Sequence, residues 1–140
     1  MIAVLGNHDT LVSNTQLPSK IKVLDGQVVK ANFGLRIGGL GGIIGNPKRH
    51  NRRDEDTFIR HMELCTRKRP HILMLHQGPE DKVRGRVGSH SITQSLEKGF
   101  SGLTLFGHTH WPDCPLIEIG DGQGLNIDAR VVVIAPNNSC

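Results

Sequence analysis

The stretch Leu103-Thr104-Leu105-Phe106-Gly107-His108-Thr109-His110 is the part of this chain that most clearly indicates both a fold and a site. Strand-forming residues run into a glycine and then into two histidines that are one residue apart. Side chains at positions i and i+2 of an extended backbone point to the same side, so His108 and His110 can aim at one centre. Gly107 allows the backbone to turn close to that centre.

Two other stretches have the same arrangement. Ile2-Ala3-Val4-Leu5 runs into Gly6-Asn7-His8-Asp9, and Ile72-Leu73-Met74-Leu75 runs into His76-Gln77-Gly78. Each apolar stretch predicts a buried strand that delivers a ligand-type residue at its carboxyl end. Open α/β sheets place their functional sites at that edge, so the pattern predicts an α/β fold with one site.

The remaining elements follow from periodicity, caps and turn residues. The sequence predicts a β-hairpin over residues 21–31 with its turn at Asp25-Gly26, and a strand at 35–37 that runs into Gly38–Gly42. These glycines could form a phosphate-binding loop, but the Lys-Ser/Thr of a P-loop does not follow them. A bend at the end of the strand is therefore the preferred interpretation. Helices are predicted over 54–68 and 92–98, the second capped by Ser89, and closing strands over 116–119, 125–127 and 131–135.

Composition is typical of one loop-rich globular domain. The chain has 140 residues, 17 glycines, no tyrosine and a net charge of +4, which favours anionic partners such as phosphates. The three cysteines have no C-x-x-C spacing, so neither a disulfide framework nor a thiolate zinc site is expected. No apolar run has membrane-spanning length and no signal peptide is visible, so a cytoplasmic protein is expected.

Two basic loops invite a functional interpretation. The loop at 46–53 is either solvated or faces a substrate, and the loop at 77–88 carries Arg84 and Arg86, which we assign to substrate binding. A small nucleic-acid-binding domain built on these loops is the weakest alternative, because aromatic residues for base stacking make up only 4% of the chain.

The ligand-type residues form one chemical set. Asn7, His76, His108 and His110 would provide one neutral oxygen and three imidazole nitrogens. Such a set suits a borderline divalent ion, namely Mn, Fe, Zn or Ni, and does not suit Ca or Mg alone.

The ordered motifs Gly6-Asn7-His8-Asp9, apolar strand to His76, and Gly107-His108-Thr109-His110 resemble the calcineurin-like metallophosphoesterases over nearly the whole chain. The resemblance implies a β-sandwich flanked by helices, here missing its first strands, with residues 1–140 as a single incomplete domain. It also implies that Asn7, His76 and His108 bind one metal and that His110 binds another. In this family pattern His8 protonates the leaving oxygen and Asp9 holds that imidazole.

The family has two earlier motifs, Asp-x-His and Gly-Asp-x-x-Asp, which carry other ligands including the bridging carboxylate. Neither is present in this chain, and none of the four aspartates that could substitute has a predicted strand-end position: Asp54, Asp56, Asp121 and Asp128. We therefore expect a phosphoesterase of phosphomono- or diesters that is active when complete and weak or inactive as this chain alone. Whether the chain is an enzyme stays open, and the alternative is a non-catalytic metal- or phosphate-binding or assembly module.

The strand at Met1–Leu5 also predicts a partner. A strand that is apolar on both faces should be central in its sheet, yet nothing before it in this sequence can pair with one of its sides. We expect a homodimer, or a partner chain, to cover it.

Overall fold

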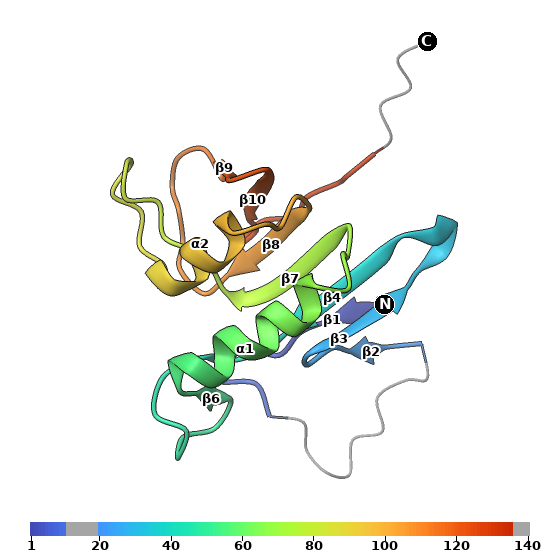
Figure 1. Ribbon diagram of the computed structural model, residues 1–140, viewed down its shortest axis with the longest axis horizontal. Helices are drawn as coiled ribbons and strands as arrows, with labels where there is room; N and C mark the ends of the chain where they lie inside the picture. Colours follow the sequence, from blue (N-terminus) through green and yellow to red (C-terminus); the bar gives the residue numbers. More distant parts are fainter. Residues whose placement is uncertain (11–19, 136–140) are drawn as a thin grey trace.

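The computed structural model of the protein describes residues 1–10 and 20–135 (Figure 1). Two α-helices, one short 3-10 helix at Asn32–Gly34 and ten strands follow one another in these residues. Their bounds are β1 (Ile2–Ala3), β2 (Lys22–Val23), β3 (Gln27–Lys30), β4 (Arg36–Leu40), β5 (Ile43–Ile44), β6 (Arg52–Arg53), α1 (Glu55–Thr66), β7 (Ile72–Gln77), α2 (His90–Glu97), β8 (Leu103–Gly107), β9 (Leu116–Ile119) and β10 (Gly122–Asn126).

The main sheet is mixed and six-stranded, in the order β3-β4-β7-β8-β10-β9. Its four inner strands run parallel, and the edge strands β3 and β9 are antiparallel to their neighbours. The carboxyl ends of β4, β7, β8 and β10 therefore meet at one edge of the sheet. This is the edge at which the sequence predicts the site.

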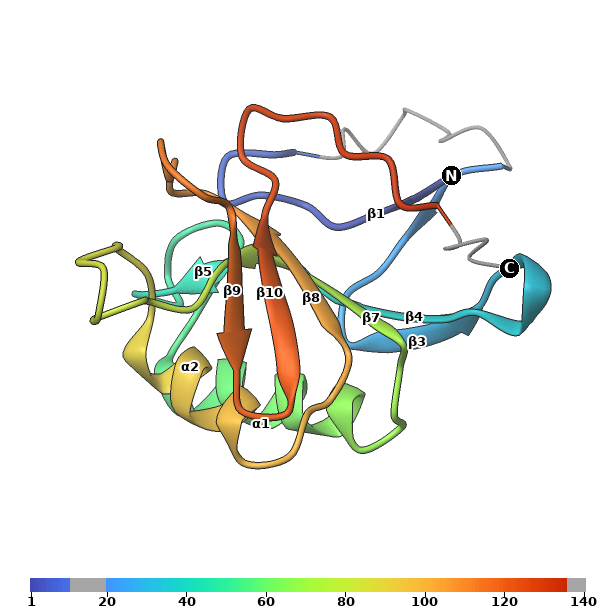
Figure 2. The ribbon, with the colours of Figure 1, turned by 90° about the horizontal axis from the view of Figure 1, so that it is seen from above.

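Both helices cover the same face of the sheet (Figure 2). Asp54 caps α1, its side chain accepting the Thr57 N–H at 2.9 Å, and Ser89 caps α2 by accepting the Ile92 N–H at 3.4 Å. The hydrogen bonds from Thr57 hold the pKa of Asp54 below its usual value. Both predicted helices are confirmed, and α2 begins directly after the predicted cap.

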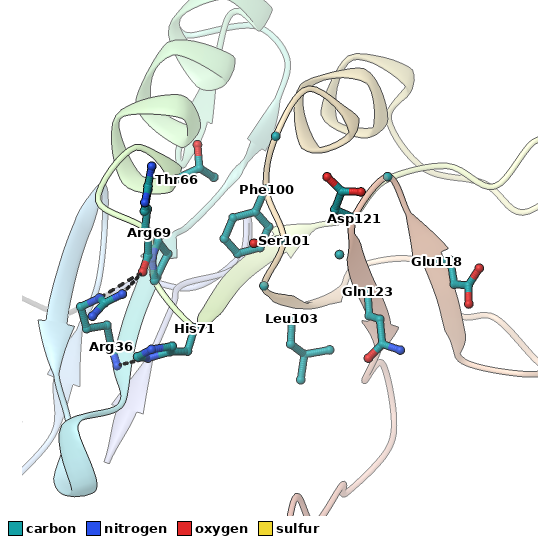
Figure 3. Close-up of a pocket in the computed structure, with 15 residues that line it drawn as sticks. Arg36, Thr66, Arg69, His71, Phe100, Ser101, Leu103, Glu118, Asp121 and Gln123 are labelled. Atoms are coloured by element: carbon teal, nitrogen blue, oxygen red, sulfur yellow. Dashed lines mark hydrogen bonds between the residues drawn. The ribbon is translucent and has the colours of Figure 1, made fainter.

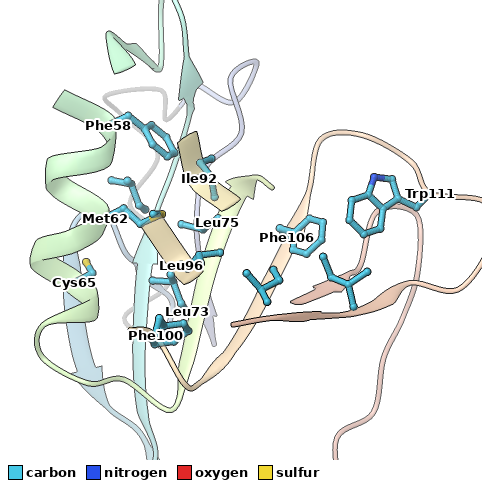
Figure 4. Close-up of a cluster of buried hydrophobic side chains, with 13 residues drawn as sticks. Phe58, Met62, Cys65, Leu73, Leu75, Ile92, Leu96, Phe100, Phe106 and Trp111 are labelled. Atoms are coloured by element: carbon cyan, nitrogen blue, oxygen red, sulfur yellow. The ribbon is translucent and has the colours of Figure 1, made fainter. Parts of the chain in front are cut away.

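The hydrophobic core lies between the helices and this face (Figure 4). Phe58 and Met62 of α1 and Leu96 of α2 pack against Leu73 and other strand residues with almost no exposed surface. Alternation along the strands sends every second residue to the opposite face, where Met74 and Leu105 are only partly buried. The sheet is thus fully covered on one face and incompletely on the other.

A second β layer lies on that opposite face (Figure 2). It consists of β1 and β2, which pair in parallel, and it packs closely because Gly39 of β4 has no side chain. A Cβ at Gly39 would lie 2.7 Å from Leu24 Cβ and 2.8 Å from Val4 Cγ1. Gly39 therefore serves the stacking of the two layers, and the predicted α/β fold with stacked sheets and flanking helices is confirmed.

Three sequence-based predictions about strands are wrong. The Met1–Leu5 stretch is not a fully buried central strand, since β1 spans two residues that are partly exposed. The 21–31 hairpin is not formed, because β2 joins β1 while β3 pairs with β4 in the main sheet. Residues 131–135 form no strand with any part of the chain that the structure describes, and Val131 and Val133 are 96% and 86% exposed.

The reason for the missing hairpin lies at the predicted turn. Asp25 pairs with Arg53 at 2.6 Å and accepts the Gly41 N–H at 3.3 Å, which fixes the chain at a corner between the two layers. Local turn chemistry predicted the bend, but long-range contacts decided its direction.

Among residues 1–10 and 20–135, no helix is long and apolar enough to cross a bilayer. Cys65 is buried in the core, Cys114 is exposed, and both are free thiols. Burial raises the pKa of the Cys65 thiol.

Candidate functional site

Three ligand-type side chains meet at the carboxyl edge of the main sheet. His76 lies near the end of β7, His108 follows β8 directly, and Asn7 lies in the turn after β1. The Asn7 Oδ1 and His76 Nε2 atoms are 3.0 Å apart, and the ring centroids of His76 and His108 are 4.9 Å apart. The structure therefore brings together residues that are far apart in the sequence, on the partly covered face of the sheet.

The environment of His76 favours its neutral form. Burial, together with the neighbouring His108 imidazole, lowers the pKa of His76 below its usual value, although Asp9 and Asp128 act in the opposite direction. A neutral imidazole keeps one nitrogen lone pair, which is the form that can accept a hydrogen bond or bind a metal ion.

His110 lies beside Asp128, one of the aspartates for which no strand-end position was predicted. Its Nδ1 atom is 3.5 Å from Asp128 Oδ2, and Asp128 follows β10 by two residues. Asp128 therefore has a strand-end position, contrary to the sequence-based expectation. Its place directly after the predicted strand at 125–127 was the available signal.

His8 and Asp9 do not form the pair that the resemblance implies. His8 is exposed, and the Asp9 Oδ2 atom accepts the backbone N–H of Gly6 at 2.6 Å. The part of the chain that the structure describes shows no hydrogen bond between the His8 and Asp9 side chains. The Asp9 carboxylate closes the turn that presents Asn7, and leaves the His8 imidazole free.

The basic loop at 46–53 holds this turn in place. The Asn51 side-chain amide donates to the carbonyl oxygens of Gly6 and Asp9, both at 2.8 Å. His50 Nε2 lies 2.8 Å from the Asp9 carbonyl oxygen. Asn51 and His50 were not singled out from the sequence, since only the fold brings residues so distant along the chain into contact.

The two arginines assigned to substrate binding differ in their surroundings. The Arg84 side chain is 58% exposed and pairs with Asp81 at 3.1 Å. The Arg86 side chain is 8% exposed, lies 3.6 Å from Asp81, and stacks over Trp111 with its guanidinium carbon 5.1 Å from the ring centroid. Arg86 thus holds its loop against Trp111, and this buried position does not suit contact with a substrate.

The donor atoms of Asn7, His76 and His108 meet part of what a divalent metal ion requires. Metal bonds of about 2.0–2.2 Å to nitrogen and oxygen place two adjacent ligands about 3 Å apart, and Asn7 Oδ1 and His76 Nε2 have this spacing. In the described part of the chain, no three His, Cys, Asp or Glu side chains form a group that could hold a metal ion. Asn7, His76 and His108 therefore offer an incomplete ligand set at a suitable spacing.

A cavity lies elsewhere in the described part of the chain, at the other edge of the sheet. It has a volume of about 980 Å³ and opens at the amino ends of β7 and β8, beside the turn between β9 and β10 (Figure 3). Arg36 on its wall is bound to the Arg69 carbonyl oxygen, and its backbone N–H donates to His71 Nδ1 at 2.9 Å. The charged residues that line it are all exposed, and it is at the opposite edge of the sheet from the histidines.

The fold is similar to known structures, although the sequence is not. No family model matches the sequence, and no curated protein is significantly similar to it. The crystal structure of TT1561 of Thermus thermophilus aligns with a TM-score of 0.61 and 16% identity, over 76% of this chain and 49% of that one. A second crystal structure aligns with a TM-score of 0.60 and 11% identity, over 77% of this chain and 46% of that one.

These alignments define the class of fold. The chain shares the α/β fold of these two structures, with a mixed six-stranded sheet and two helices. It spans about half the length of the solved structures that it matches.

Proposed function

We propose that this chain is the C-terminal portion of a metal-dependent phosphoesterase domain, which hydrolyses phosphomonoesters or phosphodiesters when complete. The observation that carries the proposal is the meeting of Asn7, His76 and His108 at the carboxyl edge of the sheet. The similarity of fold supports it, and so do the motifs from which the resemblance was drawn.

The proposed roles are those that the resemblance implies, and the closeness of Asn7, His76 and His108 supports them. Asn7, His76 and His108 would hold one divalent ion and His110 a second, with Mn, Fe, Zn or Ni as the candidates. Such ions polarise a phosphoryl group and make hydroxide available at neutral pH. His8 is exposed beside this centre, and a histidine can protonate a leaving oxygen because its pKa lies near the working pH.

Asp9 and Asn51 would support the same centre indirectly, because their side chains hold the backbone of the turn that carries Asn7 and His8. Their hydrogen bonds to the Gly6–Asp9 turn hold Asn7 and His8 in position relative to β7 and β8. A fixed geometry matters because small displacements of catalytic groups lower rates strongly. Arg84 is the exposed arginine that remains available to attract a phosphate.

The alternative is a non-catalytic module that binds metal or phosphate, or that serves assembly. Two observations favour this non-catalytic module. The Asp9 carboxylate binds the Gly6 N–H and not the His8 ring, and the metal-ligand set of the described residues is incomplete. A measurement of phosphoesterase activity with added divalent metal distinguishes the enzyme from the non-catalytic module.

We expect at most weak turnover of a chromogenic phosphodiester by this chain with added Mn²⁺, below about 1 s⁻¹, which is under the usual range for enzymes. The residual activity should fall to background in His8→Ala, because this variant removes the proposed proton donor. His71→Ala at the opposite edge of the sheet is the matched control and should keep the activity. Turnover within the usual enzymic range that depends on His8 would mean that the chain already has a full set of ligands.

A further inference from the structure

We infer that the tip of the hairpin formed by β3 and β4, residues 30–36, docks on an anionic lipid surface. Phe33 enters the boundary between the headgroups and the acyl chains, and Lys30 and Arg36 bind the headgroups. The tip projects from one end of the molecule, away from the edge of the sheet that carries the candidate site (Figures 1 and 2). This docking is separate from the proposed phosphoesterase and does not depend on it.

Phe33 is the most exposed large apolar residue in the part of the chain that the structure describes. It is 106% exposed, and its neighbour Leu35 is 36% exposed. An aromatic ring gains much from leaving water, so a ring that is fully exposed at a projecting tip indicates an interaction surface.

The backbone of the tip holds this ring outward. Phe33 has a φ of +58° and a ψ of +22°, in the left-handed region that aromatic residues rarely adopt. The Ala31 N–H donates to the Leu35 carbonyl oxygen at 2.7 Å, and the Leu35 N–H donates to the Asn32 carbonyl oxygen at 3.3 Å. Glycine or asparagine would suit position 33 better, and such local strain is typical of sites where function overrides stability.

Two cations lie side by side at the base of the tip. Lys30 and Arg36 are directly opposite each other in the pairing of β3 with β4, and both are exposed. Directly opposite residues of an antiparallel pair lie on the same face, where like charges repel. Arg36 Nε also donates to the Arg69 carbonyl oxygen at 3.0 Å, which fixes the arginine side chain. An anionic surface would relieve the repulsion between the two cations.

Acidic residues are scarce in this half of the chain. Asp9 and Asp25 are the only acidic residues before Asp54. The Asp9 carboxylate accepts the Gly6 N–H, and the Asp25 carboxylate pairs with Arg53. No acidic residue therefore lies within the hairpin to neutralise its cations.

The neighbourhood of the tip has the same sign. The exposed Lys22 lies in β2, which pairs in parallel with β1 beside the N-terminus, at the same end of the molecule as the tip (Figures 1 and 2). Glu118 and Asp121 line the same cavity as Arg36, but they lie across it from this arginine (Figure 3). The tip thus combines an apolar apex with a cationic base, and this charge is complementary to anionic headgroups.

A lipid surface fits the tip better than a nucleic acid does. Single-stranded nucleic acids stack successive bases on several aromatic side chains. Phe33 has no aromatic neighbour for this purpose, because the other four aromatic residues of the chain are buried: Phe58, Phe100, Phe106 and Trp111. The aliphatic Leu35 beside it suits acyl chains, and attachment to a surface requires no membrane-spanning helix.

The first test measures co-sedimentation of the chain with vesicles of phosphatidylcholine and phosphatidylserine, and with vesicles of phosphatidylcholine alone. The original chain should partition onto the anionic vesicles, more weakly at high salt, and hardly onto the neutral ones. Phe33→Gly should lower the partition coefficient at least about tenfold, because the whole ring is lost. This variant should still fold, because glycine adopts the left-handed conformation without strain. Lys30→Gln should lower the coefficient about fivefold.

Two matched controls lie on the loop 81–86, at the other end of the molecule from the tip (Figure 1). Val83 is 92% exposed and the Lys82 side chain is 68% exposed, so Val83→Ser and Lys82→Gln remove an apolar group and a charge from equally accessible positions. Both should leave the partition coefficient unchanged. Equal binding by Phe33→Gly and the original chain, or equal binding to neutral and anionic vesicles, would overturn the proposal. A tip that instead binds single-stranded RNA or a second copy of the chain, with the binding lost in Phe33→Gly, would also overturn it.

The second test reports on insertion directly. Trp111 is the only tryptophan and is buried, so Phe33→Trp adds one exposed fluorophore at the tip. Its emission should shift to shorter wavelength with anionic vesicles and should be quenched by brominated acyl chains. The original chain, with Trp111 alone, should show neither change. An unchanged emission in Phe33→Trp would refute the insertion of this residue into the lipid.

Discussion

Replacing Gly42 with alanine is expected to lower the free energy of unfolding by about 3–5 kcal/mol, near the upper end for a single substitution. Gly42 has a φ of +73°, and a Cβ there would lie 2.3 Å from the backbone oxygen of Asn51. Backbone cannot move aside as a flexible side chain can, so the loop at 46–53 must shift. Because this loop holds the Gly6–Asp9 turn, the substitution should disturb the candidate site as well.

Equilibrium unfolding in urea checks this expectation, with the buried Trp111 as the fluorescent probe and circular dichroism as a second one. Gly26→Ala is the matched control, since Gly26 also has a positive φ, +82°, but has open space where the Cβ would be. It should destabilise the chain by only about 1–2 kcal/mol, which is the effect of the backbone conformation alone. Equal losses in the two variants would mean that the contact with Asn51 relaxes without strain.

The second large effect is expected in assembly. We expect the chain to form a homodimer at micromolar concentration, with the layer that lies opposite the helices in the contact. Val131 and Val133 are exposed, and Met74 and Leu105 below this layer are partly exposed. Among the described residues, β1 has one hydrogen-bonded neighbour, β2. Exposed strand edges and exposed apolar side chains of this kind are normally paired or covered.

Val133→Lys should weaken the dimer at least about tenfold, because burying one valine is worth about 1.5–3 kcal/mol and each 1.4 kcal/mol is a factor of ten. Val83→Lys is the matched control, since Val83 is 92% exposed on the 81–86 loop, away from this layer. Sedimentation equilibrium measures both variants. A stable monomer would contradict the expectation and would mean that the chain covers this layer itself. The segment 11–17, the first candidate for such a cover, lies outside the described residues.

Much of the fold was predictable because its signals are local. The apolar strands at residues 72–75 and 103–106 and the two helices were found from periodicity, and Asp54 and Ser89 from the chemistry of helix caps. A strand-end bend at the glycines after residue 37 was preferred over a phosphate loop, but β4 continues to Leu40, and Gly39 inside this strand allows the close approach of Leu24 and Val4.

The candidate site was predictable in its residue types and in part of its geometry. The strand-end positions of His76 and His108 indicated that they would converge, because β7 and β8 are parallel neighbours that end at a common edge. Asn7 joins them from the turn after β1, which belongs to the second layer. The contacts of Asn51, Arg86 and Asp128 were not predictable, since each depends on a loop whose partner is distant in the sequence.

The sequence by itself determined the two helices and the inner strands β7 and β8, and it indicated which residue types could bind a metal, because side-chain periodicity and donor chemistry are properties of the local chain. Only the tertiary structure decided that β1 and β2 form a separate layer, that Asp25 turns the chain away from a hairpin, and that Asp128 lies beside His110. These outcomes depend on contacts between strand ends and loops of different elements, and such contacts form only when the sheet has fixed its strand order.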